Sequence, residues 1–460
     1  MSTTATTATT ATTGNTGAAG TAGTTGGRRV AVTGVGVLTA LGEGRGETWK
    51  GLLEGRTAVG PIRGYDASSL ATRLAAELPD FKAARYAPRK SLRMTTRNDQ
   101  LAIAGAALAA EDAGLDLAGD AAAGGGYDPE RAGVFVGGNK EISNPEHLLN
   151  GSLAGRREDG KADLRQLGER ASSAFYPLYF VEGLQSASLF HLSHAHGFKG
   201  ANSYYHGTAD AGLTALARGY RSIKGGESDV VIAGGFDDAS SWWVMTKMDG
   251  MGVLTKRNES GAGAFRPYDR ERSGSVLGEG AAFLVMEEWE AAERRGARIY
   301  AEVRGFGATQ DPELVTPHPA GEPLAAALRK ALREARVDAG DVDYVAAHGC
   351  ATRLGDLTEA RALTSVFGRD GATAAGSVKP SAGHLVAGAG ALNAAVCAMA
   401  LDGGALPPTL GLDDLDPECA GMDWVAGAAR EERVRHTVAI GRGFEGQQTA
   451  LVLSAPAARP

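Results

Sequence analysis

Two histidines in the second half of the chain stand beside glycines, where an apolar, strand-like run gives way to helical sequence. His348 follows the run 344–347 and precedes Gly349, and His384 comes five residues after Lys379. One histidine in such a place is more often structural than catalytic, but two in matching positions indicate a shared site. A neutral imidazole can donate an N–H hydrogen bond to a carbonyl oxygen that gains negative charge. His348 and His384 are therefore the first candidate catalytic residues.

A sharp turn within residues 201–238 is a second candidate site. The turn from Gly207 to Asp210 leads into a helix with apolar residues at helical spacing, and a strand follows at 229–235. The first residues of a helix carry free N–H groups and the positive end of its dipole, which stabilise a thiolate or an oxyanion. Neither Cys nor Ser stands in this turn, so a plain strand-turn-helix connection remains an alternative.

Alternating strands and helices must position these residues. The pattern predicts strands over 30–37 and 133–138 and helices over 43–53, 99–111 and 385–399. Gly34 and Gly36, where the first strand breaks into glycines, suggest a dinucleotide-binding motif, but Thr39 occupies the place of its third glycine. The sequence therefore disfavours a Rossmann fold.

Composition limits the classes of protein that the chain can belong to. With 460 residues, 43% hydrophobic and 22% charged, it is long enough for one large globular domain or several smaller ones. The formal charge of -7 gives no electrostatic reason to bind nucleic acid or an anionic membrane. Three cysteines, Cys350, Cys397 and Cys419, are too few for a disulfide framework. We expect a cytoplasmic protein without nucleic acid or membrane partners.

The first 27 residues contain no charged side chain and consist mainly of Thr, Ala and Gly. They lack the basic and leucine-rich regions of a secretion signal, and they offer little apolar surface to bury. We expect residues 1–27 to be a disordered tail. No stretch approaches 18 uninterrupted apolar residues, so we expect no transmembrane helix.

Six motifs spread over most of the chain resemble the β-ketoacyl synthases of the thiolase superfamily. They are RVAVTGVGVLTALG, SDVVIAGGFDDA, FRPYDRERSGSVLGEGAAFLVME, AAHGCATRLGD, SVKPSAGHLVAGAGALNA and GRGFEGQQTALVLS. The resemblance implies an α/β fold with five αβαβα layers and two similar βα halves, 28–297 and 298–456. It also implies a dimer, no bound cofactor, and substrates delivered on the phosphopantetheine arm of an acyl carrier protein.

The resemblance assigns roles to residues that match the motifs. His348 and His384 match the two family histidines, and Lys379 matches the lysine that orients and tunes them. Thr352 matches a threonine that hydrogen-bonds the pantetheine arm, and Phe444 matches the gating phenylalanine. Glu445 replaces a glycine of the family's gating loop, so the motion of that loop is open here.

The nucleophile of the family is missing. Aligned without gaps over 200–235, the family's elbow cysteine falls on Ala209, or on Asp210 if the alignment shifts by one residue. Neither forms a thioester, and we interpret Asp210 as a helix cap. Cys350 replaces a family threonine two residues after His348, so we expect it to line the pocket. A relocated nucleophile at Cys350 is disfavoured because the elbow's dipole and N–H donors lie elsewhere.

Two kinds of relative lack the cysteine. One is the chain-length-factor subunit of type II polyketide and polyene synthases, which pairs with a cysteine-bearing ketosynthase. The other is the decarboxylating ketosynthase, which carries glutamine there and keeps the histidines. We favour the chain-length-factor interpretation, because a partner's cysteine makes the loss tolerable. The alternatives are a malonyl-carrier-protein decarboxylase, a non-covalent acyl transfer catalyst that uses His348 and His384, or a purely structural scaffold.

A run of basic residues without an intervening acid lies between Lys82 and Arg97. Such a run is usually just a solvated face, but the family docks its acidic carrier protein on a basic patch in this region. We predict that Arg89, Lys90 and Arg93 contribute to carrier-protein docking.

A cluster of histidines raises the alternative of a metal protein. The cluster comprises His191, His194, His196 and His206. The H-x-x-H-x-H spacing does not place its members on one helical face, and no carboxylate or thiol motif completes a site. We expect no metal.

Overall fold

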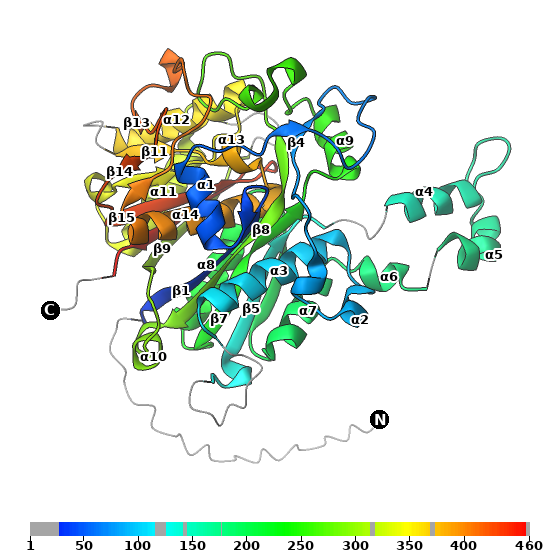
Figure 1. Cartoon of the computed structure of the whole chain (residues 1–460), viewed down its shortest axis with the longest axis horizontal. Helices are drawn as coiled ribbons and strands as arrows, with labels where there is room; N and C mark the ends of the chain where they lie inside the picture. The colour runs from blue at the N-terminus through cyan, green and yellow to red at the C-terminus, as the bar shows by residue number, and fades with distance from the viewer. Residues whose placement is uncertain are drawn as a thin grey trace, which may run out of the picture.

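The computed structural model describes residues 27–115, 126–140, 145–175, 177–312, 318–368 and 373–456. The predicted disordered tail, residues 1–27, lies outside the described residues apart from Gly27. Most of the described residues belong to one body with a large central sheet, and the predicted α/β thiolase-like class is confirmed (Figure 1). The halves 28–297 and 298–456 remain a proposed division of the chain.

The sheet consists of two halves with the same strand order. Four short strands of this sheet, β2 (Gly42–Glu43), β3 (Gly60–Pro61), β4 (Leu74–Ala76) and β13 (Asp423–Trp424), lie outside the shared order. In chain order, the five main strands of the first half are β1 (Val30–Thr39), β5 (Ala132–Gly138), β6 (Asn202–His206), β7 (Val230–Asp238) and β8 (Leu277–Glu288). Those of the second are β9 (Ala301–Gln310), β10 (Tyr344–Ala346), β11 (Ala374–Gly376), β15 (His436–Arg442) and β16 (Gln447–Ser454). When the five strands of each half are numbered 1 to 5 in chain order, both halves have the order 3-2-4-5-1 across the sheet. In each half, strand 2 pairs in parallel with strands 3 and 4. Antiparallel pairing of β1 with β9 joins the halves.

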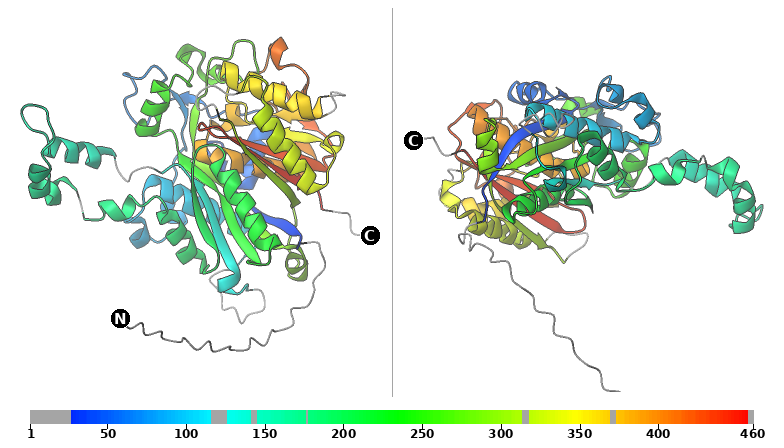
Figure 2. Two further views of the ribbon diagram at one scale, coloured as in Figure 1. Left: turned by 180° about the vertical axis from the view of Figure 1, so that it is seen from behind. Right: turned by 90° about the horizontal axis from the view of Figure 1, so that it is seen from below.

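Helices complete five layers. The first half has α3 (Arg97–Asp112) on its outer face, and the second half has α11 (Glu322–Ala335) and α12 (Arg353–Phe367) on its outer face (Figures 1 and 2). Two helices fill the middle layer, α8 (Ala211–Lys224) and α14 (Ala389–Gly403), which pack on each other and on both halves of the sheet. The order is therefore αβαβα, with two similar halves, as expected.

Burial explains why the central strands read as continuous apolar runs. Every residue of β1 and β5 is buried, because helices cover both faces of the sheet. Gly36 in β1 allows α3 to approach closely, since a Cβ there would lie 2.2 Å from the backbone oxygen of Gly105. This glycine thus serves helix packing rather than phosphate binding, which explains why the dinucleotide motif is incomplete.

The predicted elements are confirmed with one difference. The first strand, the 43–53 and 99–111 helices, the 133–138 strand and the strand-turn-helix-strand unit of 201–238 all form. The predicted helix 385–399 begins later, at Ala389, because a 3-10 turn over Val386–Gly388 precedes it. Val386 has a φ of 37°, which an α-helix does not accommodate.

The segment containing α14 bears on the prediction that the chain has no transmembrane helix. Among the described residues, one segment, Val386–Gly403, is long and apolar enough to cross a bilayer by length and composition alone, although Asn393 and Asp402 interrupt its apolar run. The segment is mostly buried between the two halves of the sheet. Its apolar character is therefore accounted for by packing in the core.

The remaining helices lie around this core. They are α1 (Arg45–Leu53), α2 (Arg89–Leu92), α4 (Pro145–Ala154), α5 (Leu164–Ala174), α6 (Tyr179–Glu182), α7 (Ala187–His196), α9 (Trp242–Gly250), α10 (Trp289–Arg294) and α13 (Lys379–Ala382). Figures 1 and 2 show α4 and α5 standing away from the body, on the side of α6 and α7. This region carries exposed apolar side chains, among them Leu153, Leu164 and Phe180.

Candidate active site

The two histidines line one pocket of about 270 Å³. Their ring centres lie 5.3 Å apart and the ring planes are nearly perpendicular, at 83°. His348 follows β10, and His384 follows β11 and the short helix α13. Because β10 and β11 are parallel neighbours, their carboxyl ends meet at one edge of the sheet. Three further predicted site residues share the pocket wall, namely Cys350, Thr352 and Phe444.

One hydrogen bond sets the tautomer of His384. Its Nδ1 accepts from the backbone N–H of Val386 at 3.1 Å, so the proton of the neutral ring lies on Nε2. Burial, followed by the charge of Lys379, holds the pKa of His384 well below its usual value. The ring is therefore neutral at physiological pH and carries one N–H donor that can point toward a substrate oxygen.

Buried polar groups hold the backbone around His348. Glu359 of α12 accepts from the backbone N–H groups of His348 (2.7 Å) and Gly349 (2.9 Å). The Asn393 side chain of α14 donates to the oxygens of Ala347 (3.2 Å) and Ile440 (2.9 Å), and thus ties the end of β10 to β15. These bonds fix the direction from which the imidazole enters the pocket.

Lys379 contacts the backbone of His348 and does not line the pocket. Its Nζ donates to the backbone oxygen of His348, and its side chain is buried. Burial lowers the pKa of Lys379 to about 8. The pKa of His348 is held well below its usual value by burial and by the charge of Lys379, so this ring is also neutral.

The loop after His348 takes an unusual backbone path. Gly349 and Ala351 have φ values of 47° and 57°, in the left-handed region that is costly for alanine. Asp356 stabilises this path, because one of its oxygens accepts from the N–H of Ala351 at 3.0 Å. Its other oxygen accepts from the N–H of Tyr268 at 2.8 Å. Burial raises the pKa of Asp356 to about 7.

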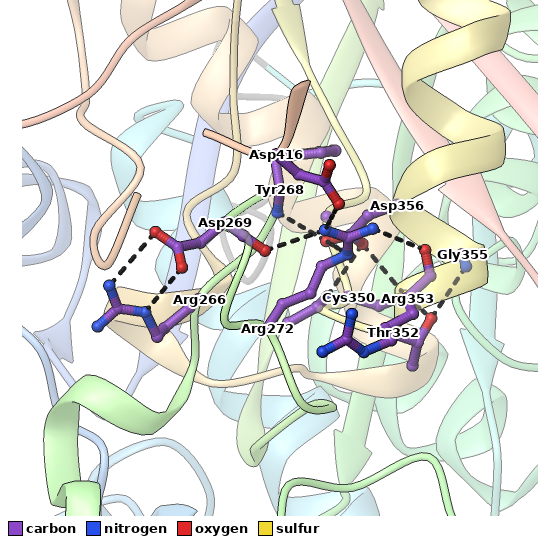
Figure 3. Close-up of polar contacts among 12 residues, drawn as sticks. Arg266, Tyr268, Asp269, Arg272, Cys350, Thr352, Arg353, Gly355, Asp356 and Asp416 are labelled. Atoms are coloured by element: carbon purple, nitrogen blue, oxygen red, sulfur yellow. Dashed lines mark hydrogen bonds and ion pairs between the residues drawn. The ribbon is translucent and has the colours of Figure 1, made fainter. Parts of the chain in front are cut away.

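Arg272 links this loop to the rest of the second half (Figure 3). The guanidinium donates to Asp416 (2.6 Å) and to the backbone oxygens of Asp269 (2.9 Å) and Arg353 (3.0 Å). Its Nε lies 4.0 Å from Asp356, so the buried cation also offsets the charge of that carboxylate. The strained loop is thus supported by a charged network beneath it.

Cys350 and Thr352 occupy the wall that this loop forms. Cys350 Sγ lies 3.2 Å from Thr352 Oγ1 and 3.7 Å from Asp356 Oδ1. Burial, together with the charge of Asp356, raises the pKa of the Cys350 thiol to about 11. The thiol is therefore protonated at neutral pH, which argues against its use as a relocated nucleophile.

Ala209 lies at the elbow before α8 and is buried, outside the pocket lining. Its backbone oxygen packs between α14 and β15, where a Cβ on Gly441 would approach it to 2.6 Å. The elbow contacts the pocket wall through Thr208, whose Oγ1 accepts from the backbone N–H of Phe444 at 2.9 Å. Residue 209 therefore carries a buried methyl group at this elbow.

The interpretation of Asp210 as a cap was wrong in its chemistry. Asp210 occupies the N-cap position of α8, but its side chain makes no capping hydrogen bond. The carboxylate instead lies beneath the Gly443 backbone, and its Oδ1 has no hydrogen-bond partner among the described residues. Burial, with a contribution from the charge of Glu445, raises the pKa of Asp210 to about 6.

The two loop residues that sequence analysis singled out, Phe444 and Glu445, make different contacts. Phe444 packs against an apolar cluster that includes Val244 and Met245 of α9. Glu445, in the place of the family glycine, is exposed, and its backbone oxygen accepts from Gln310 Nε2. The loop before β16 is thus bonded to β9 as well as to the elbow.

The basic run of 82–97 divides into two groups. Arg97 makes a double hydrogen bond with the buried Glu279 (3.0 and 3.1 Å), and Arg85 pairs with Glu43. By contrast, Arg89, Lys90 and Arg93 are exposed on and after α2, and no described carboxylate lies within ion-pair distance of them. The three residues predicted for carrier docking are therefore exposed and, like Lys82 of the same run, make no ion pair with a described carboxylate.

The four histidines that raised the possibility of a metal site lie on two different elements. His191, His194 and His196 lie on α7, whereas His206 ends β6. Among the described residues, no three His, Cys, Asp or Glu side chains come close enough together to hold a metal ion.

Sequence reasoning missed several site residues. Arg442, Gln448 and Asp311 line the pocket, and Asn393 braces His348 from below. Asp356 and Glu359 did leave a signal in the sequence, since residues three apart lie on the same face of a helix.

Two family models cover most of the chain. The β-ketoacyl synthase N-terminal domain matches residues 27–292, and the β-ketoacyl synthase C-terminal domain matches residues 300–413. The ketoacyl synthase alpha subunit of the tetracenomycin polyketide synthase from Streptomyces glaucescens is 35% identical over 433 residues. That alignment covers 93% of this chain and 97% of the relative.

A second relative and a solved structure show the same family relationship. The 3-oxoacyl-[acyl-carrier-protein] synthase 2 of Coxiella burnetii is 34% identical over 429 residues, covering 93% of this chain and 98% of that protein. The solved structure of the ishigamide ketosynthase/chain length factor superposes with a TM-score of 0.81 at 30% identity, covering 94% of this chain and 100% of the other. Taken with the five-layered fold and the histidine pocket, these matches show that the chain belongs to the β-ketoacyl synthase family.

Proposed function

We propose that this chain is the chain-length-factor-like subunit of a heterodimeric ketosynthase in type II polyketide or polyene biosynthesis. A partner subunit supplies the reactive cysteine, and this subunit helps to shape the acyl tunnel. The observation that carries the proposal is Ala209 at the elbow. Its methyl group cannot form a thioester, so condensation needs a nucleophile from elsewhere.

The edge of the sheet supports a dimer. Among the described residues, β6 pairs only with β5, so its other edge leaves backbone N–H and C=O groups without a strand partner. Helix α7, which contacts β6, carries the exposed side chain of Phe190, and the projecting region before it carries those of Leu149, Leu153 and Phe180. Apolar surface beside an open strand edge is typical of a protein interface. The likeness to a ketosynthase/chain length factor supports a cysteine-bearing ketosynthase as the partner.

Substrates reach the pocket on the phosphopantetheine arm of an acyl carrier protein in this proposal. Arg89, Lys90 and Arg93 form the exposed basic surface that meets the acidic carrier. Thr352 and Cys350 in the pocket wall contact the arm, and Phe444 bounds the entrance. No bound cofactor takes part. The three free cysteines fit the reducing cytoplasm as the place of action.

A second candidate function rests on the intact histidine pair. The Nε2–H of His384 and the neutral His348 suit a malonyl thioester whose carbonyl oxygen gains charge. In that reaction the bond between the carboxylate carbon and the methylene carbon breaks, carbon dioxide leaves, and the electron pair forms an enolate that later takes a proton from water. The chain would then act as a malonyl-carrier-protein decarboxylase or as a non-covalent acyl transfer catalyst.

Intact-protein mass spectrometry of malonyl-loaded carrier protein tests the proposal. The carrier is incubated with this chain alone, with its His348→Ala variant, and with this chain purified together with a cysteine-bearing ketosynthase. We expect elongated acyl chains only when both subunits are present, and no malonyl loss above background with this chain alone. Malonyl loss by the chain alone that disappears in His348→Ala would establish the decarboxylase instead.

A further inference from the structure

Arg442 places a positive charge in the wall of the histidine pocket. It is the last residue of β15 and pairs with Gln448 of β16 across the sheet. Arg442 lines the pocket together with His348 and His384. Its charge is also close enough to lower the pKa of His348, after the larger effects of burial, Lys379 and His384.

Three hydrogen bonds hold the guanidinium rigidly. Nε donates to Gln448 Oε1 at 3.0 Å, Nη1 to the backbone oxygen of Gly355 at 2.7 Å, and Nη2 to Thr358 Oγ1 at 3.0 Å. All three acceptors are neutral. A guanidinium has five N–H groups, so these bonds leave one N–H on each terminal nitrogen. The free donors belong to a group that is already ordered before any ligand binds.

The positive charge of Arg442 has no protein counter-ion among the described residues. No carboxylate lies within 4.0 Å of it, whereas Arg272 and Arg97 are paired with Asp416 and Glu279. Asp311, the acid in the pocket lining, accepts from the backbone N–H of His318 at 2.8 Å. Arg442 is half-buried, and a partly desolvated positive charge in a cavity wall without a counter-ion favours an anionic ligand.

We propose that Arg442 binds the free carboxylate of an acyl group whose thioester carbonyl lies against His348 and His384. The ligand class is a carboxylate-terminated acyl chain on a pantetheine arm, with malonyl as the shortest member. The proposal rests on the function proposed above, because it assumes that acyl groups enter this pocket. Arg442 is then a specificity residue that selects charged acyl groups over neutral ones of similar size.

Geometry separates this ligand from the phosphate of the arm. Arg442 and the histidines share one pocket of about 270 Å³, so a group on Arg442 lies near the thioester. The phosphate is attached at the opposite end of the pantetheine arm. A planar guanidinium also suits a carboxylate, because it can donate two parallel N–H bonds to its oxygens.

Binding of four stable ligands to the full-length chain, measured by calorimetry, tests the proposal. The ligands are malonyl and acetyl pantetheine in which an amide replaces the thioester, each with and without the 4′-phosphate. We expect wild type to prefer malonyl to acetyl, and Arg442→Gln to weaken malonyl binding by about 10- to 100-fold. Acetyl binding should change by less than about twofold, whether or not the phosphate is present.

Two further variants separate charge from structure. Arg442→Lys keeps the charge but loses the hydrogen bonds to Gly355 and Thr358, so it should retain part of the preference for malonyl. Arg353→Gln removes an exposed arginine that does not line the pocket, and it should bind all four ligands as wild type does. Thermal denaturation of each variant shows whether the fold is intact.

The outcomes are distinct. Equal loss of acetyl and malonyl binding in both Arg442 variants would show a structural role and overturn the proposal. A loss confined to the phosphorylated ligands would assign Arg442 to the phosphate and overturn it as well. If wild type binds acetyl and malonyl equally and Arg442→Gln changes neither, only this inference fails. If wild type binds none of the four ligands, this inference is wrong, and so is the part of the proposed function in which acyl groups enter this pocket.

Discussion

His348 and His384 approach within 5.3 Å, centre to centre, although they stand 36 positions apart and follow different strands. The parallel pairing of β10 with β11 brings them together, and separate hydrogen bonds hold each one. Glu359 fixes the backbone of His348, whereas Val386 fixes the ring of His384. The pair is therefore preorganised without any contribution from the residue at the elbow.

Restoring a thiol at the elbow should restore nucleophilic character. Ala209→Cys places a cysteine before α8, where the helix dipole lowers a thiol's pKa. Residue 209 is buried, so we compare it with a second thiol in the same chain, and we expect iodoacetamide at pH 7.5 to alkylate residue 209 faster than Cys350, as detected by peptide mapping. Cys350 in the same protein is the internal control, because burial raises its pKa to about 11. Alkylation of residue 209 no faster than that of Cys350 would argue that the elbow lies elsewhere.

Removing the Asn393 side chain should destabilise the site and the fold together. Asn393→Ala leaves the buried oxygens of Ala347 and Ile440 without a side-chain donor. Each buried group left unsatisfied costs about 1–3 kcal/mol, so the free energy of unfolding should fall by about 2–5 kcal/mol. Urea denaturation measures it. Asn150→Ala, on the exposed helix α4, is the control and should change stability by less than about 0.5 kcal/mol. A similar loss in both variants would contradict a bracing role.

Asp210 should make stability depend on pH. Burial raises its pKa from 3.8 to about 6, so the folded state holds a proton that the unfolded state releases. The free energy of unfolding is therefore highest below about pH 4. It falls as pH rises through about 6, by an amount on the order of 3 kcal/mol. Asp210→Asn should remove this decline. The test is the urea midpoint of wild type and of Asp210→Asn at pH 4.5 and 7.5. If the midpoints of the two proteins change equally between these pH values, the carboxylate of Asp210 does not titrate with a raised pKa.

Reversing the exposed basic charges should weaken carrier-protein binding. The triple variant Arg89→Glu, Lys90→Glu and Arg93→Glu should raise the dissociation constant by at least about tenfold at low salt, chiefly by slowing association. The matched control reverses Arg329, Lys330 and Arg333, which are exposed on α11, and makes the same change in net charge. Surface plasmon resonance with immobilised carrier protein measures both. Equal weakening by the two triple variants would show that only net charge matters.

Local patterns predicted the elements well but left out much of the site. The strand over 30–37 and the helix over 99–111 form because their apolar periodicity matches their burial. Arg442 and Asn393 gave no signal, because each acts on segments far away in the chain, such as Gly355 and Ala347. The side chain of Asp210 looked like a cap because local sequence does not show that the loop at Gly443 covers it.

The sequence by itself determined the family, the strand-turn-helix elbow with Ala209, and the two histidines with Lys379, because these depend on residue types at short spacing. Only the tertiary structure decided that the rings meet in one pocket, that Val386 fixes the tautomer of His384, and that Arg442 shares this pocket with no counter-ion from the part of the chain that the structure describes. The physical reason is distance along the chain. Hydrogen bonds and charges act over a few ångströms, and which groups come that close depends on how the two halves of the sheet pack around α8 and α14.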